Sequence, residues 1–465
     1  MTSSIKEIMT KIPYYNQLVK PLHIIETFHA ASKNNYPGAT MKVIGVTGTN
    51  GKTTTTWMIY SILREKFGDK VGVMSTIGWG WGDEIQNQTA HATTENPAVL
   101  QKHLAKMREA GVEYVVLEVS SHALAQHRVF GIPFDAAVFT NLSPDHLDYH
   151  KTMTKYREAK ERLFKLVAKN HSGAQLGVIN DDDAVARFFE RDVPKMVRYG
   201  LKKTNDITAK HVKLAPTGVE YDLILNDAAK NTLKISSNKS HKFHIKTQIP
   251  GEFNVYNSLA ATAIGLQYGV TPTEITRGIA KLTSVPGRMD AVDEGQDFSV
   301  IIDFATTPDA FENVLPGIRA TTKGRLITLF GLPGRRDQTK GSAMGKVAAQ
   351  YADVIILTED DARGNVRAQS DKIAAGIPAD FTKNCGKVQF IDDRTAAIDQ
   401  AIALARPDDT VVLLGKGPEK IIARQIGDKV VDQPWDEAAT ARAAIQKSLK
   451  STPKTRRTRG KRAKK

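Results

Sequence analysis

The chain has 465 residues, of which 41% are hydrophobic, 25% charged and 7% aromatic, a composition that excludes a disordered or fibrous protein. At roughly 150 residues per domain, the length predicts about three domains. No run approaches the roughly 18 consecutive apolar residues of a membrane helix, and the N-terminus lacks the pattern of a secretory signal. The single cysteine, Cys385, excludes an internal disulfide framework and a cysteine zinc cluster, and it predicts a cytoplasmic protein.

The net charge of 65 − 50 = +15 is concentrated at the C-terminus. Residues 451–465 contain eight Lys or Arg and no acid, which leaves 57 − 50 = +7 for residues 1–450. The body is therefore only modestly basic, and we do not expect nucleic acid as a partner except through the tail. We interpret the tail as a disordered extension, with a contact to nucleic acid or anionic lipid as the alternative.

The first part of the chain has a weak helical pattern (Ile5, Ile8, Met9, Ile12) and then a series of short apolar runs. The runs are rich in β-branched residues, as buried strands are, and each is followed by a segment long enough for a helix. They lie at 41–46, 71–77, 113–119, 135–140 and 175–179. Strands that alternate with helices predict a mostly parallel sheet.

The stretch from about 205 to 250 has a different pattern. Its short alternating pieces are VEYDLIL, NTLKIS and HKFHIKT, which predict an antiparallel patch, and a helix is expected at 257–268. A second strand–helix series follows Pro286-Gly287, with strands expected near 298–304, 325–330, 353–358, 387–391 and 410–414. The chain is therefore expected to form two α/β domains.

A glycine-rich loop follows the first predicted strand and should begin a helix. Residues 45–54 read GVTGTNGKTT, in which the glycines let backbone N–H groups face phosphate oxygens, Lys52 reaches the terminal phosphates and Thr53 can ligate Mg²⁺. The strict Walker A pattern has glycine where this chain has Val46. An ordinary strand–helix turn is the alternative, but it leaves the position of Lys52 unexplained. The nucleotide-binding residues expected here are Gly48, Thr49, Asn50, Gly51, Lys52, Thr53 and Thr54.

The fold class predicted from these patterns is α/β throughout. We expect a shortened N-terminal segment at 1–40 and a P-loop central domain at 41–285, whose mostly parallel sheet carries the antiparallel patch. A Rossmann-like α/β C-terminal domain should follow at 286–450, and the basic tail at 451–465.

Three further residues stand where a ligand could bind. Glu118 ends a predicted parallel strand, beside the crevice where ligands bind in α/β sheets, and it could ligate Mg²⁺ or be a solvated strand-end acid. His146 also follows a strand, but a lone histidine is more often structural. Lys160, in YREAKERLF, has the pattern of a surface charge on an amphipathic helix.

Seven blocks of sequence occur in the order found in one enzyme family. They read TGTNGKTTT, EVSSHAL, FTNLSPDHLDYHKTM, PGEFNVYN, VPGRMD, DFATTPDA and GKGPE. In these blocks the chain resembles the Mur ligases, and most of all the MurE-type UDP-N-acetylmuramoyl-tripeptide synthetases of peptidoglycan precursor synthesis. The resemblance extends from about residue 41 to 440.

The resemblance implies ATP- and Mg²⁺-dependent amide ligation, in which a substrate carboxylate becomes an acyl phosphate and an amine then displaces phosphate. It implies that Thr53 and Glu118 hold one Mg²⁺. His146 and Lys160 match a second metal site, where the family's lysine carries a carbamate and so presents a carboxylate to the metal. The residues that it implies for catalysis are Lys52, His146, Lys160 and Arg288.

Other matched positions imply nucleotide and substrate contacts. Asn257, Arg288 and Asp303 match nucleotide-binding positions. The positions that match muramoyl-peptide contacts are Thr93, Thr94, Ser120, Gln126 and Arg128. The positions that match contacts to the incoming amino acid are Asp360, Asp361, Arg363, Gly415 and Glu419.

The chain also departs from the family pattern. Only 40 residues precede the first predicted strand, fewer than the family's usual uridine-binding domain has. The block usually written YAHTPD is FATTPD at 304–309, and the usual GKGHE is GKGPE at 415–419, so each lacks a histidine. The usual DNPR of diaminopimelate-adding members is DDAR at 360–363, and it keeps Arg363.

These observations predict a monomeric, cytoplasmic ATP-dependent ligase that adds a diamino acid to UDP-N-acetylmuramoyl-L-alanyl-D-glutamate. Arg363 favours meso-diaminopimelate over lysine, because an arginine can bind the distal carboxylate. Two alternatives remain open. One is the same chemistry on another acceptor, as in folylpolyglutamate or cyanophycin synthetases. The other is a nucleotide-binding scaffold without ligase activity, which the two missing histidines motivate.

Overall fold

The computed structural model describes residues 20–88, 93–215, 217–236, 242–334, 337–383 and 386–451. The chain divides into two compact units, Met1–Thr283 and Ser284–Lys465. The helical pattern at residues 5–12, Cys385 and residues 452–465 of the basic tail lie outside the described residues.

The first unit is built on one large mixed sheet, which has 11 strands among the described residues, in the order β11-β10-β9-β8-β7-β6-β1-β5-β2-β3-β4. The pairs from β9 through β8, β7, β6, β1 and β5 to β2 are parallel, and antiparallel strands continue the sheet at both edges. The strands are β1 (Lys42–Thr47), β2 (Val71–Met74), β3 (Gly78–Trp81), β4 (Glu84–Asn87), β5 (Tyr114–Glu118), β6 (Phe134–Phe139), β7 (Leu176–Asn180), β8 (Lys195–Gly200), β9 (Ile207–Ala215), β10 (Gly218–Leu225) and β11 (Lys242–Thr247).

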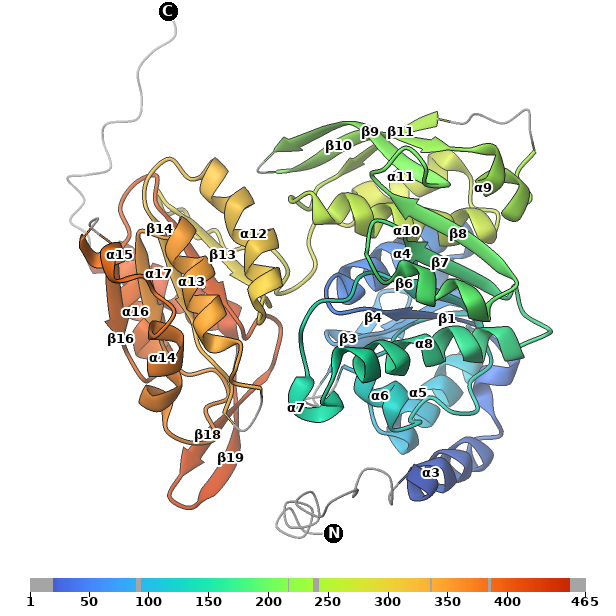
Figure 1. Ribbon diagram of the computed structural model, residues 1–465, viewed down its shortest axis with the longest axis horizontal. Helices are drawn as coiled ribbons and strands as arrows, with labels where there is room; N and C mark the ends of the chain where they lie inside the picture. Colours follow the sequence, from blue (N-terminus) through green and yellow to red (C-terminus); the bar gives the residue numbers. More distant parts are fainter. Residues whose placement is uncertain are drawn as a thin grey trace, which may run out of the picture. The chain divides into compact units, whose positions relative to one another are not determined.

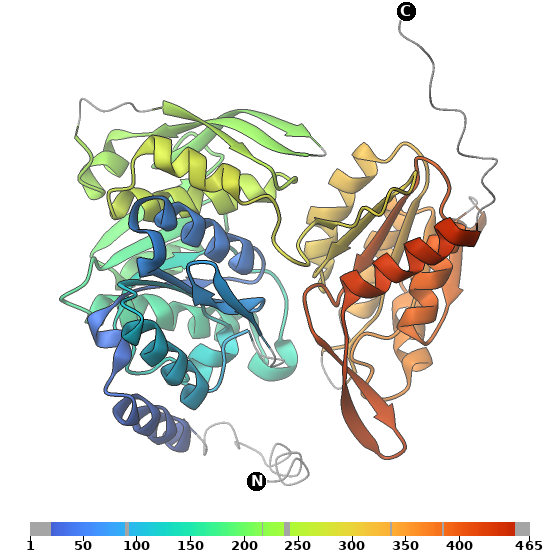
Figure 2. The same cartoon turned by 180° about the vertical axis from the view of Figure 1, so that it is seen from behind.

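Helices cover both faces of this sheet (Figure 1). On one face α4 packs against α10 and α11, and on the other α8 packs against β6 and α6 (Figure 2). Gly278 of α11 permits the close packing on α4, because a Cβ there would lie 2.7 Å from the Cα of Ile62. The helices are α3 (Lys20–Lys33), α4 (Lys52–Phe67), α5 (Pro97–Glu109), α6 (Ser121–Ala125), α7 (Leu147–His150), α8 (Met153–Lys169), α9 (Asp227–Thr232), α10 (Phe253–Gln267) and α11 (Pro272–Lys281), with 3₁₀ turns at Pro37–Thr40, Gly68–Lys70, Ala186–Phe188 and Glu190–Asp192.

The second unit has a smaller sheet in the order β12-β13-β17-β14-β15-β16, in which the described pairs are parallel except β12–β13. A separate hairpin, β18–β19, follows the last sheet strand. The strands are β12 (Asp290–Ala291), β13 (Ser299–Asp303), β14 (Leu326–Phe330), β15 (Val354–Leu357), β16 (Lys387–Phe390), β17 (Thr410–Leu414), β18 (Ile421–Ile426) and β19 (Lys429–Pro434). The helices are α12 (Pro308–Thr321), α13 (Gly341–Tyr351), α14 (Val366–Ala374), α15 (Ala379–Lys383), α16 (Arg394–Leu404) and α17 (Glu437–Ser451).

The predicted α/β fold class is confirmed, with a mostly parallel sheet, an antiparallel patch and a second sheet. One predicted strand is wrong. The NTLKIS piece at 231–236 lies at the end of helix α9 and in the turn after it, because Asn226 caps that helix by accepting a hydrogen bond from the N–H of Ala229. The helix expected at 257–268 begins earlier, at Phe253. The structure adds β8, β9, β12 and the β3–β4 and β18–β19 hairpins to the predicted elements.

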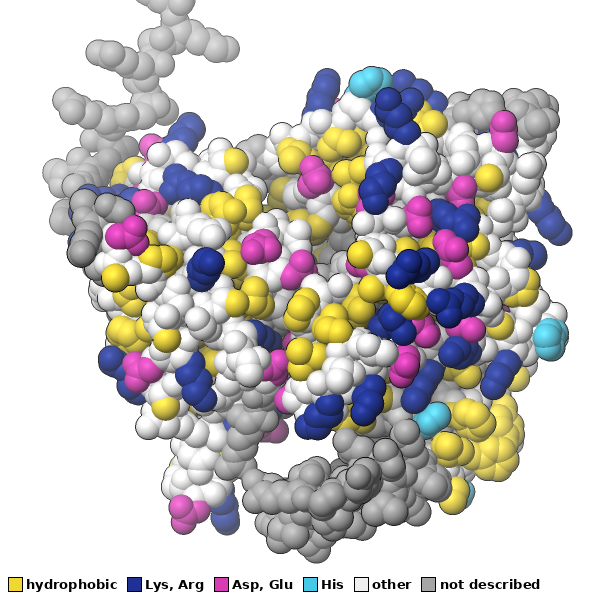
Figure 3. Space-filling view, in the orientation of Figure 1, with side chains coloured by type: hydrophobic (Ala, Val, Ile, Leu, Met, Phe, Trp, Pro, Cys, Tyr) yellow, Lys and Arg dark blue, Asp and Glu magenta, His cyan; other side chains and the backbone are white. Residues whose placement is uncertain are grey.

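The surface agrees with a modestly basic body. Figure 3 shows Lys and Arg side chains interspersed with Asp and Glu on the face that it displays. Among the described residues, no helix is both long enough and apolar enough to cross a membrane.

A buried ion pair supports the core of the second unit. Arg394 and Glu437 have fully buried side chains, and two nitrogens of the guanidinium bind the carboxylate. Trp435 Nε1 donates a further hydrogen bond to Glu437, at 2.8 Å. Removal of the cation would leave a carboxylate in the core without its counter-charge, and such losses are costly.

We expect Arg394→Met to lower the free energy of unfolding by about 3–5 kcal/mol, the usual cost of breaking a buried pair. The matched control is Arg367→Met, because the Arg367–Asp371 pair is more than half exposed and should contribute at most about 1 kcal/mol. Chemical denaturation of both variants measures the difference. Equal losses would show that the Arg394 pair contributes no more than a surface pair.

Candidate active site

The phosphate loop runs from the end of β1 to the first turn of α4, where Thr53 and Thr54 are buried. Two of its glycines lie so close to other segments that no side chain fits. A Cβ at Gly48 would lie 1.8 Å from Thr140 Oγ1, and a Cβ at Gly51 would lie 2.5 Å from Asn257 Oδ1. Gly51 also has φ +79°, in the left-handed region that favours glycine. The glycines that the sequence singled out are therefore required by the packing.

Residues that follow β6 hold this loop in shape. Asn50 N donates to Asn141 Oδ1 at 2.8 Å, and Asn141 Nδ2 donates to Asn50 O at 3.2 Å. Thr140 Oγ1 also donates to Asn50 O, at 2.6 Å. Sequence reasoning did not assign roles to Thr140 and Asn141, although both lie in the FTNLSPDH block, directly after a strand. Lys52 Nζ donates to Thr49 O at 2.7 Å, so its ammonium lies against the loop.

Asn257 lies against the same loop. Its Oδ1 accepts a hydrogen bond from Thr55 Oγ1 at 3.1 Å, and its Nδ2 donates to Asn254 Oδ1 at 2.8 Å. The side chain is nearly fully buried. The structure therefore brings Asn257, which only the family resemblance had singled out, to the first turn of α4.

Glu118 is buried at the carboxyl end of β5, where 1% of its surface is exposed, so the alternative of a solvated strand-end acid is wrong. Both of its oxygens lie 3.1 Å from Thr53 Oγ1. The N–H and the hydroxyl of Thr76 also donate to Glu118, at 2.9 and 3.1 Å. Sequence reasoning missed Thr76, whose only signal is its position just after the neighbouring strand β2. A hydroxyl and a carboxylate oxygen are ligands that Mg²⁺ accepts, so this pair fits a magnesium site.

Lys160 does not behave as a surface charge. It has 1% of its surface exposed, on the inner side of α8, and its ammonium donates to Gly48 O in the phosphate loop. Burial and the nearby positive charge of Lys52 lower the pKa of Lys160 well below its usual value. A lowered pKa favours the neutral amine, which is the form that reacts with CO₂ to give a carbamate.

His146 is the N-cap residue of α7, with φ +54°, and the centre of its ring lies 6.1 Å from the centre of the Tyr156 ring. Its Nε2 is 3.3 Å from Asp145 Oδ2, and Asp145 is also close enough to influence Lys160 electrostatically. Among the described residues, no group of three or more His, Cys, Asp or Glu is arranged to hold a metal ion. The predicted set of Thr53, Glu118, His146 and Lys160 differs from such a group, since it needs a lysine converted to a carboxylate.

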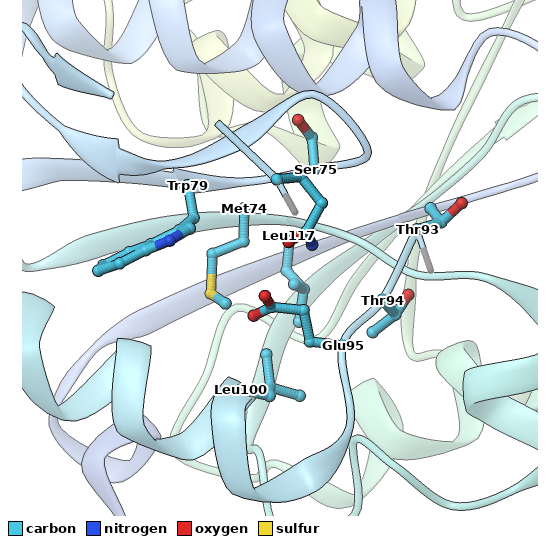
Figure 4. Close-up of a pocket in the computed structure, with 9 residues that line it drawn as sticks. Met74, Ser75, Trp79, Thr93, Thr94, Glu95, Leu100 and Leu117 are labelled. Atoms are coloured by element: carbon cyan, nitrogen blue, oxygen red, sulfur yellow. The ribbon is translucent and has the colours of Figure 1, made fainter. Parts of the chain in front are cut away.

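Four of the five positions that match muramoyl-peptide contacts form one hydrogen-bonded chain. Thr94 Oγ1 accepts from Ser120 N at 2.9 Å, and the carbonyl of Thr94 accepts from Arg128 Nη1 at 2.9 Å. Arg128 Nε donates to Gln126 Oε1 at 2.8 Å. Thr93 and Thr94 line a small pocket (Figure 4). Its other lining residues are Met74, Ser75, Trp79, Gln88, Glu95, Leu100 and Leu117.

In the second unit, Asp303 and Arg288 lie together. The carboxylate of Asp303 accepts hydrogen bonds from Met289 N and Ala305 N, both at 2.8 Å. Burial raises the pKa of Asp303, and the positive charge of Arg288 opposes that effect. The guanidinium of Arg288 lies 4.6 Å from the centre of the Phe304 ring.

The amino-acid positions of the resemblance also lie together in the second unit. Lys416 Nζ is 2.9 Å from Asp361 Oδ1 and also pairs with Glu419. Arg363 Nη2 is 3.2 Å from Asp361 Oδ2, and 18% of its side chain is exposed. Arg363 is therefore a paired side chain and not a solvated loop charge. Lys416, which is fully buried, is a further residue that the sequence reasoning had left without a role.

Gly415 lies between Asp360 of this cluster and Asp303. A Cβ at Gly415 would lie 2.7 Å from Asp360 Oδ2, and the N–H of Gly415 donates to Asp303 O at 3.1 Å. Burial raises the pKa of Asp360 to about 6. The loop after β17 therefore lies against both Asp303, a predicted nucleotide-binding residue, and Asp360, a predicted amino-acid-binding residue.

Comparison with known proteins defines the class. Residues 46–265 match the Mur ligase middle domain, and residues 287–417 match the Mur ligase, glutamate ligase domain. The chain belongs to the Mur ligase family, whose members are ligases.

The chain is similar to individual members of this family. The chain is 40% identical over 413 residues to UDP-N-acetylmuramoyl-L-alanyl-D-glutamate–2,6-diaminopimelate ligase of Geobacillus thermodenitrificans (strain NG80-2), which covers 88% of this chain and 80% of the relative. It is 36% identical over 430 residues to UDP-N-acetylmuramyl-tripeptide synthetase of Roseiflexus sp. (strain RS-1), covering 90% of this chain and 81% of the relative. A solved structure of a UDP-N-acetylmuramoyl-L-alanyl-D-glutamate–2,6-diaminopimelate ligase is 29% identical, with a TM-score of 0.59 over 90% of this chain and 82% of that one.

His150, in the FTNLSPDHLDYH block, is a buried histidine beside this site. Burial, together with the nearby charges of His146 and Lys160, lowers the pKa of His150 from 6.5 to about 4. Because the folded state holds the histidine neutral, the unfolded state binds more protons between pH 4 and 6.5. This contribution to stability is therefore complete above pH 6.5 and is lost as the pH falls toward 4.

We expect the wild-type protein to lose on the order of 2–3 kcal/mol more unfolding free energy than His150→Gln between pH 7.5 and pH 4.5. Chemical denaturation at the two pH values measures this difference. His29→Gln, which removes an exposed histidine, is the matched control and should behave as wild type. Parallel pH dependence of His150→Gln and wild type would contradict the lowered pKa of His150.

Proposed function

We propose that the protein is an ATP- and Mg²⁺-dependent ligase that joins a diamino acid, meso-diaminopimelate, to UDP-N-acetylmuramoyl-L-alanyl-D-glutamate. The observation that carries this proposal is the 40% identity to a diaminopimelate ligase across 80% of that relative, together with an intact phosphate loop. The reaction would be cytoplasmic, as a step of peptidoglycan precursor synthesis, and one chain would suffice for it.

The first unit would bind ATP and activate the acceptor. Glycine-rich backbone at 48–51 and the ammonium of Lys52 would hold the phosphates, with Asn257 beside them. Bound Mg²⁺ would offset the negative charge that keeps a carboxylate away from the γ-phosphate. Thr53 and Glu118 would hold one ion, and His146 and carbamylated Lys160 the second. Burial of Lys160 supports the carbamate, since a neutral amine beside the phosphate loop is the form that can be modified.

The acceptor would be held by the chain of Thr94, Ser120, Gln126 and Arg128, with Thr93 at the same pocket. Hydroxyls and a guanidinium suit its carboxylates and phosphates. Held in this way, a glutamate carboxylate of the acceptor would attack the γ-phosphorus of ATP and displace ADP, which gives an acyl phosphate reactive enough to form the amide. The rate enhancement would come chiefly from alignment of the reactants.

Arg288 and Asp303 would contribute to nucleotide binding, and the second unit would bind the incoming amino acid. Arg363 supports diaminopimelate, because its guanidinium can pair with a distal carboxylate that lysine lacks. Asp360, Asp361, Gly415 and Glu419 would complete this site. The amine would then attack the acyl phosphate carbon, form the amide bond and release phosphate.

The purified protein should release ADP when it is supplied with ATP, Mg²⁺, the muramoyl-dipeptide nucleotide and meso-diaminopimelate. Lysine should support turnover at least about 100-fold less well, because it lacks the distal carboxylate that Arg363 would bind. An amino-acid panel with a coupled ADP assay measures the ratio. Turnover with lysine alone would refute the role of Arg363, and no turnover with any amino acid would refute the ligase.

Lys160→Ala should lower kcat on the order of 10²–10³-fold, the range seen when one preorganised electrostatic group is removed from an active site. Short carboxylic acids such as acetate should restore part of the rate, since they replace the carbamate oxygens. Lys165→Ala, an exposed lysine on the same helix, is the matched control and should keep wild-type activity. Full activity of Lys160→Ala, or the absence of rescue, would contradict the carbamate.

A further inference from the structure

Two buried side chains lie between the phosphate loop and the segment that holds the acceptor positions. Tyr156 of α8 is 1% exposed, and His150 at the end of α7 is 5% exposed. Their rings pack with centroids 5.0 Å apart and an interplanar angle of 35°. No role in nucleotide, metal or substrate binding has been given to either residue.

One end of this pair is bonded to the phosphate loop. Tyr156 OH lies 3.2 Å from Thr49 Oγ1, a buried hydroxyl–hydroxyl contact. Thr49 Oγ1 also accepts a hydrogen bond from Ser143 N, at 3.1 Å, and Thr49 N donates to Asn141 O at 2.8 Å. Thr49 is therefore fixed within the loop. A shift of the loop would displace the Tyr156 hydroxyl that contacts Thr49.

The other end is bonded to helix α6. His150 Nε2 lies 3.0 Å from Ser121 Oγ, and both groups are buried. Ser121 is the first residue of α6, directly after Ser120, whose hydroxyl caps that helix and lies 3.4 Å from Thr94 Oγ1. A displacement of Ser121 would therefore move the positions that are proposed to hold the acceptor.

We propose that Tyr156 and His150 are positioning residues that couple the phosphate loop to helix α6. Through this bridge, nucleotide held by the loop and acceptor held at Ser120 and Thr94 each tighten the binding of the other. A packed interior transmits such shifts because it has few voids to absorb them. The inference rests on the proposed function, since it assumes that both ligands bind the first unit.

The bridge can be tested with a substitution that removes a single oxygen. In the wild-type protein, saturating UDP-N-acetylmuramoyl-L-alanyl-D-glutamate should lower the Kd of a non-hydrolysable ATP analogue about tenfold, within the usual range for coupled sites. Tyr156→Phe should reduce this ratio to about threefold or less, while the Kd of each ligand alone changes by a smaller factor. Isothermal titration calorimetry with Mg²⁺ present measures all four affinities.

A substitution at the α6 end of the bridge provides a second test. Ser121→Ala should lower the ratio in the same way, and the double variant should lose little more than either single variant, because both break one path. The matched control is Tyr221→Phe, which removes a buried tyrosine hydroxyl bonded to Ser258 at 2.7 Å, outside the bridge. Tyr221→Phe should keep the tenfold ratio.

Each outcome decides the inference. A wild-type ratio in Tyr156→Phe, or an equal loss in Tyr221→Phe, would show that the coupling does not pass through Tyr156. If the wild-type protein binds both ligands without mutual tightening, the bridge is refuted and the proposed function stands. If the wild-type protein binds neither ligand, the proposed function fails and the bridge fails with it.

Discussion

The position of β1 between β5 and β6 is the constraint on which the candidate site of the first unit depends. All three strands are parallel, so their carboxyl ends lie at the same edge of the sheet. At this edge β1 is followed by the phosphate loop, β5 ends in Glu118, and β6 is followed by Thr140 and Asn141. A different strand order would separate the loop from both the carboxylate and the residues that hold the loop in shape.

Close packing at this edge explains why small residues and buried charges occur together. Gly48 and Gly51 approach neighbouring side chains so closely that a Cβ would collide with them. The same approach brings the backbone carbonyl of Gly48 to the ammonium of Lys160. Because Lys160 is cut off from water and lies near the positive charge of Lys52, its neutral form is favoured. One packing arrangement therefore shapes the loop and sets the chemistry of the lysine beside it.

The sequence was sufficient for the features that local patterns determine. Short β-branched runs predicted the parallel strands, and GTNGKT after a strand predicted the phosphate loop. Lys160 was different: on helical periodicity alone it looked exposed, because charged residues also surround it in the sequence. Its burial arises from tertiary contacts, among them the one with the carbonyl of Gly48 after β1. Thr76 and Asn141 were missed for a related reason, since their importance depends on which strands become neighbours in the sheet. The strand predicted at NTLKIS was wrong because Asn226 caps a helix there, and this local preference outweighs the alternating pattern.

In the second unit, the segment 360–363 contains no glycine, and two of its residues have a strained backbone. Asp361 and Arg363 have φ of +46° and +43°, left-handed values that cost non-glycine residues about 1–3 kcal/mol each. Such a loop persists only when its surroundings hold it. Here the carboxylate of Asp361 pairs with Lys416 and Arg363 and accepts a hydrogen bond from the N–H of Ala423. Two other segments, at Lys416 and Ala423, therefore hold it together with Arg363 of the same loop. The ion pairs that fix the strained loop also bring its charged groups together in one place, which is the arrangement that recognition of a charged amino acid requires. Positioning of charge in this loop therefore depends on the same contacts as its backbone conformation, and neither can change alone.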